Sequence, residues 1–377
     1  MFHLDEMRFA WVLLLVPQLA LAEPVPERVV VVGRVDSGTW TDAPTAARLD
    51  QKAELAAVVI ARDGKKRVVL APDLVTKVRL AGTSWKTRPL TGARIQWSTV
   101  EPHGFRTQPA TNGVTTEFYS NVSQDSKSFG KWLGYDHIDY FERIVMPWSP
   151  VATIPAVVTA GEVDAQQVPG LGTIRYKVAI ELAGKTLASP GAEAADTFGL
   201  LPVVHRVSIR KSDDFIGHLS AYLLVPEVFG SAGPGFNHQT ERFTGADCAD
   251  VMIGAARRMG RRVPYTNVAG LPTVGKSIAG AVELDDRGMP AKQIDKVKVG
   301  DLIRIDYGGT LRGHTPRDWD HVAALWEDKS DPDGPQKGGP DGRLDGFDLV
   351  IHMGHPRLVI ERLSEQAPAT IDVVRLR

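Results

Sequence analysis

The feature that most constrains the fold is a series of short apolar runs in the first half of the chain. They occupy residues 29–33, 55–61, 67–70 and 93–98. The second and third runs are joined by a segment with an Asp-Gly turn signal, which predicts a hairpin. Residues 173–182 alternate between apolar and polar side chains, the pattern of a half-exposed antiparallel strand. Helical periodicity is scarce here, so we expect an all-β sandwich over residues 27–190, for which the immunoglobulin fold is one arrangement.

The N-terminus has the sequence pattern of an export signal. An arginine precedes an apolar run that ends in Ala20-Leu21-Ala22, the small-x-small pattern of signal peptidase cleavage. The run is shorter than the roughly 20 apolar residues of a transmembrane helix. We therefore expect residues 1–22 to be a signal peptide and the protein to be periplasmic or secreted, without a stable membrane span.

The length of the chain limits the number of domains, and its net charge limits the kinds of partner. The mature length favours two domains. The Ala- and Gly-rich segment at residues 189–195 predicts a linker, with a second domain over residues 203–377. The formal net charge is −1, which makes nucleic acid a poor partner. The histidines lack the companion ligands of a zinc site, and we expect no cofactor.

Cys248 is the only cysteine in the chain. It lies at a predicted helix start, where Thr244 or Asp247 can cap the helix and an apolar stripe follows. Unpaired backbone N–H groups and the positive end of the helix dipole stabilise a thiolate at such a position. A lone cysteine is more often a small buried hydrophobe. In an exported protein, however, a cysteine without a disulfide partner indicates a reactive thiol or an intermolecular bridge.

Two histidines follow on predicted strands. His321 lies in the apolar stretch 320–327 and His352 in 349–353. A thiol nucleophile needs a base that accepts its proton, and the base needs a third group that fixes its tautomer. Neighbouring antiparallel strands could bring the two imidazoles side by side. His355 is an alternative to His352 as the orienting group.

Four motifs occur in an order that resembles the NlpC/P60 family of papain-like cysteine peptidases: DCADVM, VKVGDLIRID, DHVAALWED and LVIHMGHP. The resemblance covers residues 213–356 and implies an α+β papain-like fold for the C-terminal domain. It also implies Cys248 as the nucleophile, His321 as the general base and His352 as the third polar residue. The substrates that it implies are peptides of the cell wall, that is, of peptidoglycan.

One position departs from the family pattern. Before the nucleophile, members commonly carry a tyrosine after a proline, and this tyrosine assists the oxyanion site. Here the residue is Glu227, and an ionised carboxylate donates no hydrogen bond. We expect Asp247, Asp320 and His355 to complete the substrate or oxyanion neighbourhood with it.

The sequence therefore predicts an exported cysteine peptidase or amidase. Two alternatives stay open: a catalytically inactive envelope binding module, and an acyltransferase that uses the same thiol. A weak calcium alternative rests on Asp341, Asp345 and Asp348 in the polar segment 328–348, which partly match a calcium-binding loop. Lys337 and Gly339 occupy earlier ligand positions of that loop and do not fit it.

Overall fold

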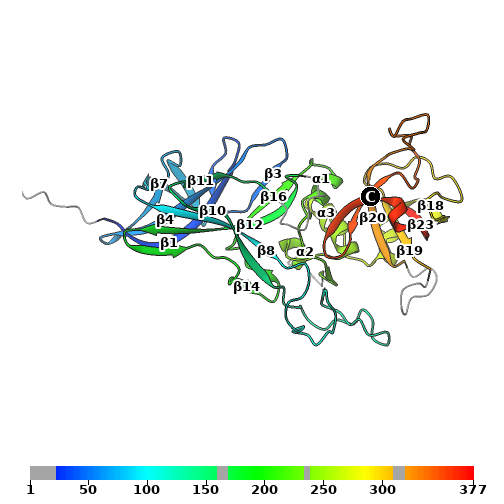
Figure 1. Ribbon diagram of the computed structural model, residues 1–377, viewed down its shortest axis with the longest axis horizontal. Helices are drawn as coiled ribbons and strands as arrows, with labels where there is room; N and C mark the ends of the chain where they lie inside the picture. The colour runs from blue at the N-terminus through cyan, green and yellow to red at the C-terminus, as the bar shows by residue number, and fades with distance from the viewer. Residues whose placement is uncertain (1–22, 159–168, 233–237, 309–318) are drawn as a thin grey trace, which may run out of the picture.

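The computed structural model describes residues 23–158, 169–232, 238–308 and 319–377, so the predicted signal peptide lies outside the described residues. The chain is mostly β, with 44% strand and 10% helix. Figure 1 shows an elongated molecule with the N-terminal strands at one end, the last strands at the other, and short helices between them.

The N-terminal end is a closed barrel of six strands. In order around the ring these are β1 (Val25–Val35), β2 (Trp40–Thr41), β6 (Lys77–Leu80), β7 (Thr83–Pro89), β5 (Lys66–Ala71) and β4 (Ala53–Asp63). The ring closes because β1 pairs with β2 and also, along nearly its whole length, with β4. The short strand β11 (Thr153–Pro155) adds to β4 from outside the ring.

The predicted sandwich is therefore wrong, and the reason lies in β1 and β4. Both strands are apolar on both faces. Val32 and Val58 pack inside the barrel around Trp40, while Val31 and Val59 pack outward in the main core. A continuous apolar run indicates burial on both faces but does not distinguish an open sheet from a closed one.

The second sheet covers the outer side of the barrel. Its order is β10 (Tyr140–Ser149), β8 (Arg94–Pro102), β12 (Gly172–Leu182), β16 (His205–Arg210) and β3 (Thr45–Arg48), with β13 (Lys185–Ala188) also paired to β12. Two small pairs flank it: β14 (Ala195–Asp196) with β15 (Gly199–Leu200), and β9 (Tyr119–Ser120) with β17 (Val228–Phe229). Because β16 pairs with both β12 and β3, the second sheet continues past the predicted linker at residues 189–195.

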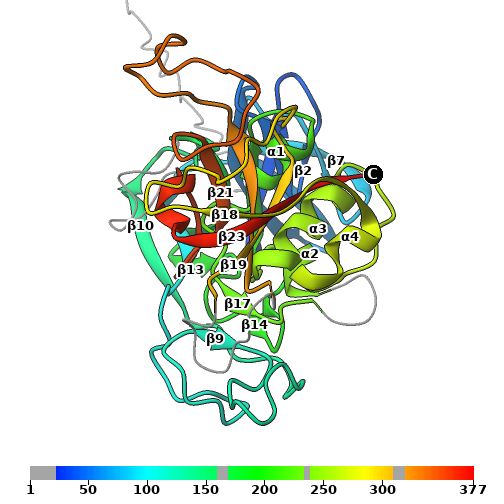
Figure 2. The ribbon, with the colours of Figure 1, turned by 90° about the vertical axis from the view of Figure 1, so that its right-hand side faces the viewer.

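The third sheet forms the C-terminal end, which faces the viewer in Figure 2. Its order is β18 (Gly275–Leu284), β23 (Ala369–Leu376), β19 (Leu302–Asp306), β20 (His321–Glu327), β21 (Leu349–Met353) and β22 (Leu358–Arg362). The helical segments are α1 (Phe215–Ser220), α2 (Gln239–Arg242), α3 (Cys248–Arg258), η1 (Val268–Gly270), α4 (Leu271–Val274) and η2 (Leu363–Gln366). Helix α3 packs in the same core as Val322, Ala324 and Ile351, which belong to one face of this sheet.

The predicted α+β papain-like fold is also wrong, because so little of the chain is helical. The longest helix among the described residues is α3, with 11 residues. The sequence also predicts a helix from Ser212 or Asp213 to Leu224, but the helix formed there, α1, covers only Phe215–Ser220. It contains Gly217, which lowers helix propensity, and Leu224 takes a left-handed conformation at φ 70° shortly before Pro226. The remaining segment makes short turns instead of a long helix.

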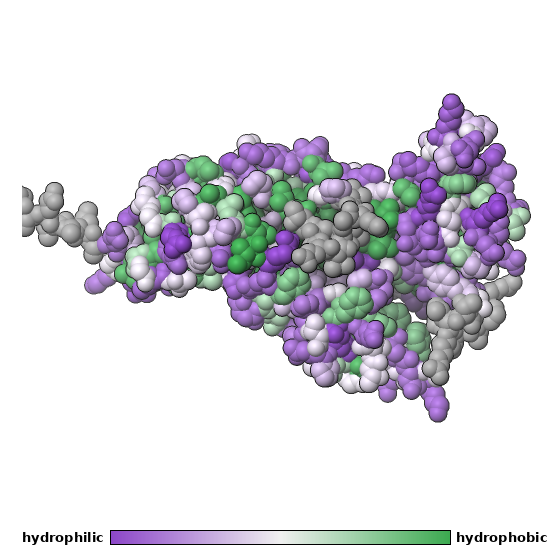
Figure 3. Space-filling view, viewed as in Figure 1, coloured by the Kyte–Doolittle hydropathy of each residue, from purple (hydrophilic) through white to green (hydrophobic). Residues whose placement is uncertain are grey.

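The surface is largely hydrophilic in the view of Figure 3, with hydrophobic side chains gathered near the middle of that face. Within the described ranges, no helix has both the length and the hydropathy needed to cross a membrane.

Candidate functional site

Helix α3 begins where the sequence predicts, with Asp247 as its N-cap. Asp247 accepts hydrogen bonds from the backbone N–H of Asp250 at 2.8 Å and of Gly230 at 2.9 Å. Both of its oxygens are used, so the cap also fixes the loop after β17 against the helix start. Cys248 is the first residue of the helix and a free thiol. Its side chain packs beside the main core.

The electrostatic surroundings of the thiol differ from the expectation of a stabilised thiolate. Burial raises the pKa of Cys248 well above its ordinary value, and the carboxylates of Asp247, Asp250 and Glu227 raise it further. Asp250 is itself buried, accepting from Ser231 Oγ at 2.9 Å and from the Ala232 N–H at 2.7 Å. Desolvation and nearby negative charge oppose the helix dipole here. The thiol is therefore protonated at neutral pH in the free protein.

His321 and His352 lie side by side. His321 opens β20 and His352 lies in β21, and the Nε2 atom of His321 is 2.9 Å from the Nδ1 atom of His352. The ring planes are nearly perpendicular, at 87°. The second nitrogen of His352, Nε2, is 3.0 Å from Glu361 Oε1 on β22. Three adjacent strands thus contribute one residue each to a continuous chain of hydrogen bonds.

This chain fixes the positions of the protons. The hydrogen bond from His352 holds the pKa of Glu361 below its usual value, so Glu361 is an ionised acceptor. On the strength of this charged acceptor we assign the proton of His352 to Nε2, which leaves Nδ1 to accept; the amide nitrogen of Gln366, 3.3 Å from the same Nε2, then makes no hydrogen bond to it. His321 consequently donates from Nε2, which leaves the lone pair on its Nδ1 atom. An imidazole in this state can take a proton from a nearby acid.

His321 is neutral as well as oriented. Burial lowers its pKa to about 3, and the neighbouring His352 contributes in the same direction. At neutral pH the free protein therefore holds an uncharged imidazole and an uncharged thiol.

Tyr307 and Gln366 support the same cluster. The Tyr307 hydroxyl donates to Gln366 Oε1, and Gln366 Nε2 donates to Glu361 Oε1 at 2.5 Å. The ring of Tyr307 is stacked 6.4 Å from that of His321. The negative charge of a Cys248 thiolate raises the pKa of Tyr307, after burial as the larger cause. Tyr307 is thus a ring neighbour of His321 and lies within electrostatic range of the thiol.

The strand register defines the side from which thiol and base could meet. Ala323 pairs with His352 and packs in the second core cluster, and His321, two residues earlier on β20, shares its face. Val322 and Ala324 are on the opposite face, which α3 covers. The strand register therefore places the side chain of His321 on the face of the sheet opposite to the one that α3 and Cys248 pack against.

The remaining candidates form a second, separate pair. Glu227 Oε2 is 2.8 Å from His355 Nδ1, and the ring of His355 stands edge-on to Phe105 at 4.9 Å. Burial raises the pKa of Glu227 although this partner opposes the shift. Of the two possible orienting groups, His352 contacts His321 and His355 contacts Glu227. Asp320 accepts from the Tyr307 N–H at 2.9 Å and so holds the end of β19.

The three aspartates of the calcium alternative are engaged in turns. Asp348 accepts from the N–H groups of Lys329 and Asp345, both at 2.8 Å. Asp345 accepts from Phe347, and Asp341 accepts from Arg343. Across the described ranges, no group of three or more His, Cys, Asp or Glu side chains is arranged to hold a metal ion. These carboxylates stabilise the loop.

Glu361, Gln366 and Tyr307 were not predicted from the sequence. A signal for Glu361 exists: residues 358–362 follow a His-Pro turn and form a strand paired with β21. In that hairpin Glu361 falls on the same face as His352, because Val359 is the cross-strand partner of His352 and Glu361 lies two residues further. Gln366 and Tyr307 lie outside the strands and give no comparable signal.

Comparison of the chain with protein-family models, curated proteins and solved structures gives no match. The site is therefore described by its own geometry: a buried thiol at the start of α3, and a hydrogen-bonded histidine pair on the opposite face of the neighbouring sheet.

Proposed function

We propose that the protein is an exported thiol hydrolase that cleaves amide bonds with Cys248 as nucleophile and His321 as base. The observation that carries the proposal is the hydrogen-bond chain from Glu361 through His352 to His321, with links of 3.0 and 2.9 Å. With the proton of His321 on Nε2, a lone pair stands on its Nδ1 atom, as a general base requires; the second requirement, a pKa near the working pH, must come from substrate binding, because burial lowers the pKa of His321 to about 3 in the free protein.

The reaction starts from a neutral pair. As the Cys248 sulfur attacks the substrate carbonyl, its proton passes to His321 Nδ1, and the carbonyl oxygen becomes an oxyanion. The developing imidazolium donates through Nε2 to His352, which in turn donates to the Glu361 carboxylate. His321 then protonates the leaving amine, and a thioester remains on the sulfur. Water, deprotonated by His321, attacks the thioester and releases the acid and the free thiol.

The raised pKa of Cys248 has a mechanistic consequence. Because three carboxylates disfavour the thiolate in the free protein, deprotonation is coupled to substrate binding. A substrate that places a positive charge near Asp250 or Glu227 would lower the cost of the thiolate. Amine-bearing peptides, including those of peptidoglycan, have this property. They are the substrate class that we propose.

A second candidate is a non-catalytic envelope binding module. It is favoured by the same raised thiol pKa and by the strand register, which places His321 on the face opposite to α3. In this case the hydrogen-bonded cluster would be a structural network, which a buried polar group needs in any function.

Purified muropeptides incubated with the wild type and with Cys248→Ala test the proposal. We expect hydrolysis by the wild type and none by a folded Cys248→Ala protein. His321→Gln should lose most activity, while His137→Gln, an exposed histidine elsewhere, should not. Full hydrolysis by Cys248→Ala refutes the thiol mechanism. Saturable muropeptide binding without hydrolysis by the wild type supports the binding module. Acyl transfer to an added peptide amine that outweighs hydrolysis in water would indicate an acyltransferase.

A further inference from the structure

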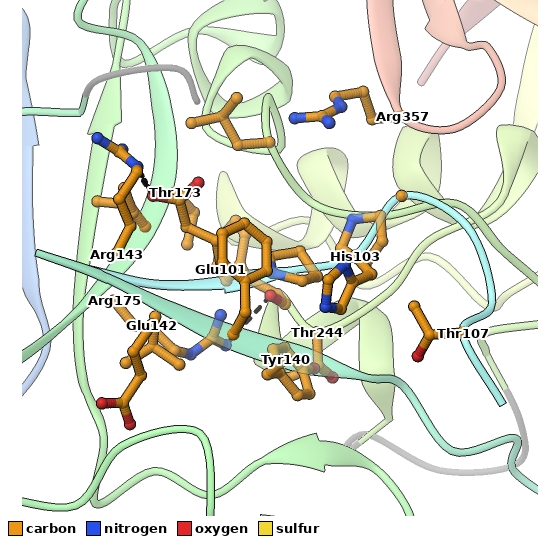
Figure 4. Close-up of a pocket in the computed structure, with 18 of the residues that line it drawn as sticks. Glu101, His103, Thr107, Tyr140, Glu142, Arg143, Thr173, Arg175, Thr244 and Arg357 are labelled. Carbon is orange, nitrogen blue, oxygen red and sulfur yellow. Dashed lines mark hydrogen bonds and ion pairs between the residues drawn. The ribbon is translucent and has the colours of Figure 1, made fainter. Parts of the chain in front are cut away.

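A cavity of about 690 Å³ opens at the second sheet, and Cys248 does not line it. It is lined by residues of β8, β10 and β12, by the segment after β8, and by residues from the helical region (Figure 4). Arg357, from the turn between β21 and β22, lines it on the C-terminal side. Pockets of about 300–1,000 Å³ are the usual size for small-molecule ligands.

The cavity exists because two neighbouring strands separate. The pairing of β8 with β12 ends at Val100 and Arg175, whereas β8 stays paired with β10 as far as Pro102 and Tyr140. Beyond Val100 the β8–β10 ribbon therefore diverges from β12, which continues beside β16 to Gly172. We call this divergence of the β8–β10 ribbon from β12 the fork. It follows from the register in which these strands pair.

The walls of the fork are mostly apolar. The apolar lining side chains include Val100, Phe141, Ile144, Ile174, Leu224 and Phe243. Two glutamates also line it, and each has its own cation: Glu101 bonds Arg143 at 2.8 Å, and Glu142 bonds Lys177 at 2.8 Å. The negative charges of the lining are thus already balanced.

Arg175 is different, because its positive charge is not balanced. It lies at the apex of the fork and is 6% exposed. One terminal nitrogen, Nη2, donates to the backbone carbonyls of Arg242 at 2.8 Å and Phe243 at 3.1 Å. Within the described residues it forms no ion pair with a carboxylate. Burial lowers the pKa of Arg175 to about 10, and the nearby charge of Arg242 acts in the same direction. A buried guanidinium without an anion is costly.

We propose that this cavity binds a small organic carboxylate with an apolar body, whose carboxylate pairs with Arg175. The guanidinium offers further N–H donors, and carboxylates are the anions that its planar geometry matches best. The apolar walls cover the body of the ligand. Such a group occurs in free aliphatic acids and at the C-terminus of apolar peptides. The site does not depend on the thiol chemistry.

Calorimetric titration of the whole protein tests this with octanoate and its neutral counterpart octanamide. We expect octanoate to bind the wild type about 10- to 100-fold more tightly, the range expected for a hydrogen-bonded charge. Arg175→Gln should remove this difference, and Arg175→Lys should retain part of it. The matched control is Arg94→Gln on β8, an exposed arginine paired with Glu181 that does not line the cavity. It should leave the difference unchanged.

Equal affinities of the wild type for octanoate and octanamide overturn the proposal, as does the absence of saturable octanoate binding at about 10 mM. This comparison uses the wild type alone, so it shows whether the cavity prefers a carboxylate even where Arg175→Gln fails to fold. An acetylated leucine dipeptide with a free C-terminus identifies the source of the ligand. Tighter binding of this peptide than of octanoate favours peptide ends, and the reverse favours free acids.

Discussion

The proton positions in the histidine pair give the sharpest prediction. Glu361 is the one ionised acceptor in the chain of hydrogen bonds that ends at His321. If the Glu361 carboxylate sets the tautomer of His352, and His352 in turn sets that of His321, then Glu361→Gln should change the tautomer of His321. The preference of His321 for a proton on Nε2 should become weaker. The His321 Nδ1 atom is the readout, because it bears the lone pair only in the correct tautomer.

The size of the effect follows from the kind of hydrogen bond. A bond to a charged group contributes about 1.5–3 kcal/mol and a neutral one about 0.5–1.5 kcal/mol. Since 1.4 kcal/mol is a factor of ten, the wild type should favour the correct tautomer by about 10- to 100-fold. In Glu361→Gln the amide oxygen can still accept from His352, but without charge. The preference should fall to about 2- to 10-fold.

Nitrogen-15 NMR of histidine-labelled protein at pH 7 measures this directly, because protonated and unprotonated ring nitrogens resonate far apart. His321→Gln assigns the signals, and Glu365→Gln, an exposed glutamate in η2, is the control. We expect an unprotonated Nδ1 on His321 in the wild type and in the control, with partial averaging in Glu361→Gln. A proton on His321 Nδ1 in the wild type would refute the assignment and, with it, the role of His321 as base.

Three further predictions concern charge. Glu227→Gln removes one of the carboxylates that raise the pKa of Cys248, so the midpoint of iodoacetamide alkylation against pH should shift downward; an unchanged midpoint contradicts this. Asp348 has its pKa raised by burial to about 8, above an unfolded value of about 3.9. The folded state then binds the extra proton, so its stability should fall as the pH rises from about 4 to 8, by at most about 1.4 kcal/mol per pH unit. In Asp348→Asn, urea unfolding should show a flatter dependence, and an identical slope would count against the assignment. Arg304 and Asp372 form a buried ion pair, so Asp372→Asn should lower the free energy of unfolding by about 3–5 kcal/mol; a loss below about 1 kcal/mol would show that Arg304 is compensated elsewhere.

Local features of this fold follow well from the sequence. The hairpin predicted from residues 55–70 is present as β4 and β5. The alternating strand at residues 173–182 is β12. Of the two caps that the sequence offers for the helix at Cys248, Thr244 and Asp247, the structure uses Asp247. In each case a few neighbouring residues carry the whole signal, because capping and strand alternation are short-range effects.

Long-range pairing was not predictable in the same way. Closure of the barrel depends on β1 meeting β4 on one side and β2 on the other, and the sequence of β1 favours burial without specifying its neighbours. The candidate site shows the same limit. Sequence order suggested that His321 and His352 could meet, but the surroundings of Cys248 depend on Asp250, Glu227 and Tyr307. These residues come from three separate segments, and their desolvation arises only from tertiary packing.

The pairing of β16 with β12 and β3 bears on how the protein resists proteolysis. A protease that cut between residues 189 and 195 would still leave the two pieces bound, because β16 lies between two strands from the other side of the cut. Physical separation would expose the unpaired backbone groups of β12 over residues 172–176, together with the apolar side chains of Val207 and Ile209. Such an edge promotes aggregation. The nicked chain should therefore remain associated under native conditions, and both pieces should dissociate only when the whole molecule unfolds in a single cooperative transition.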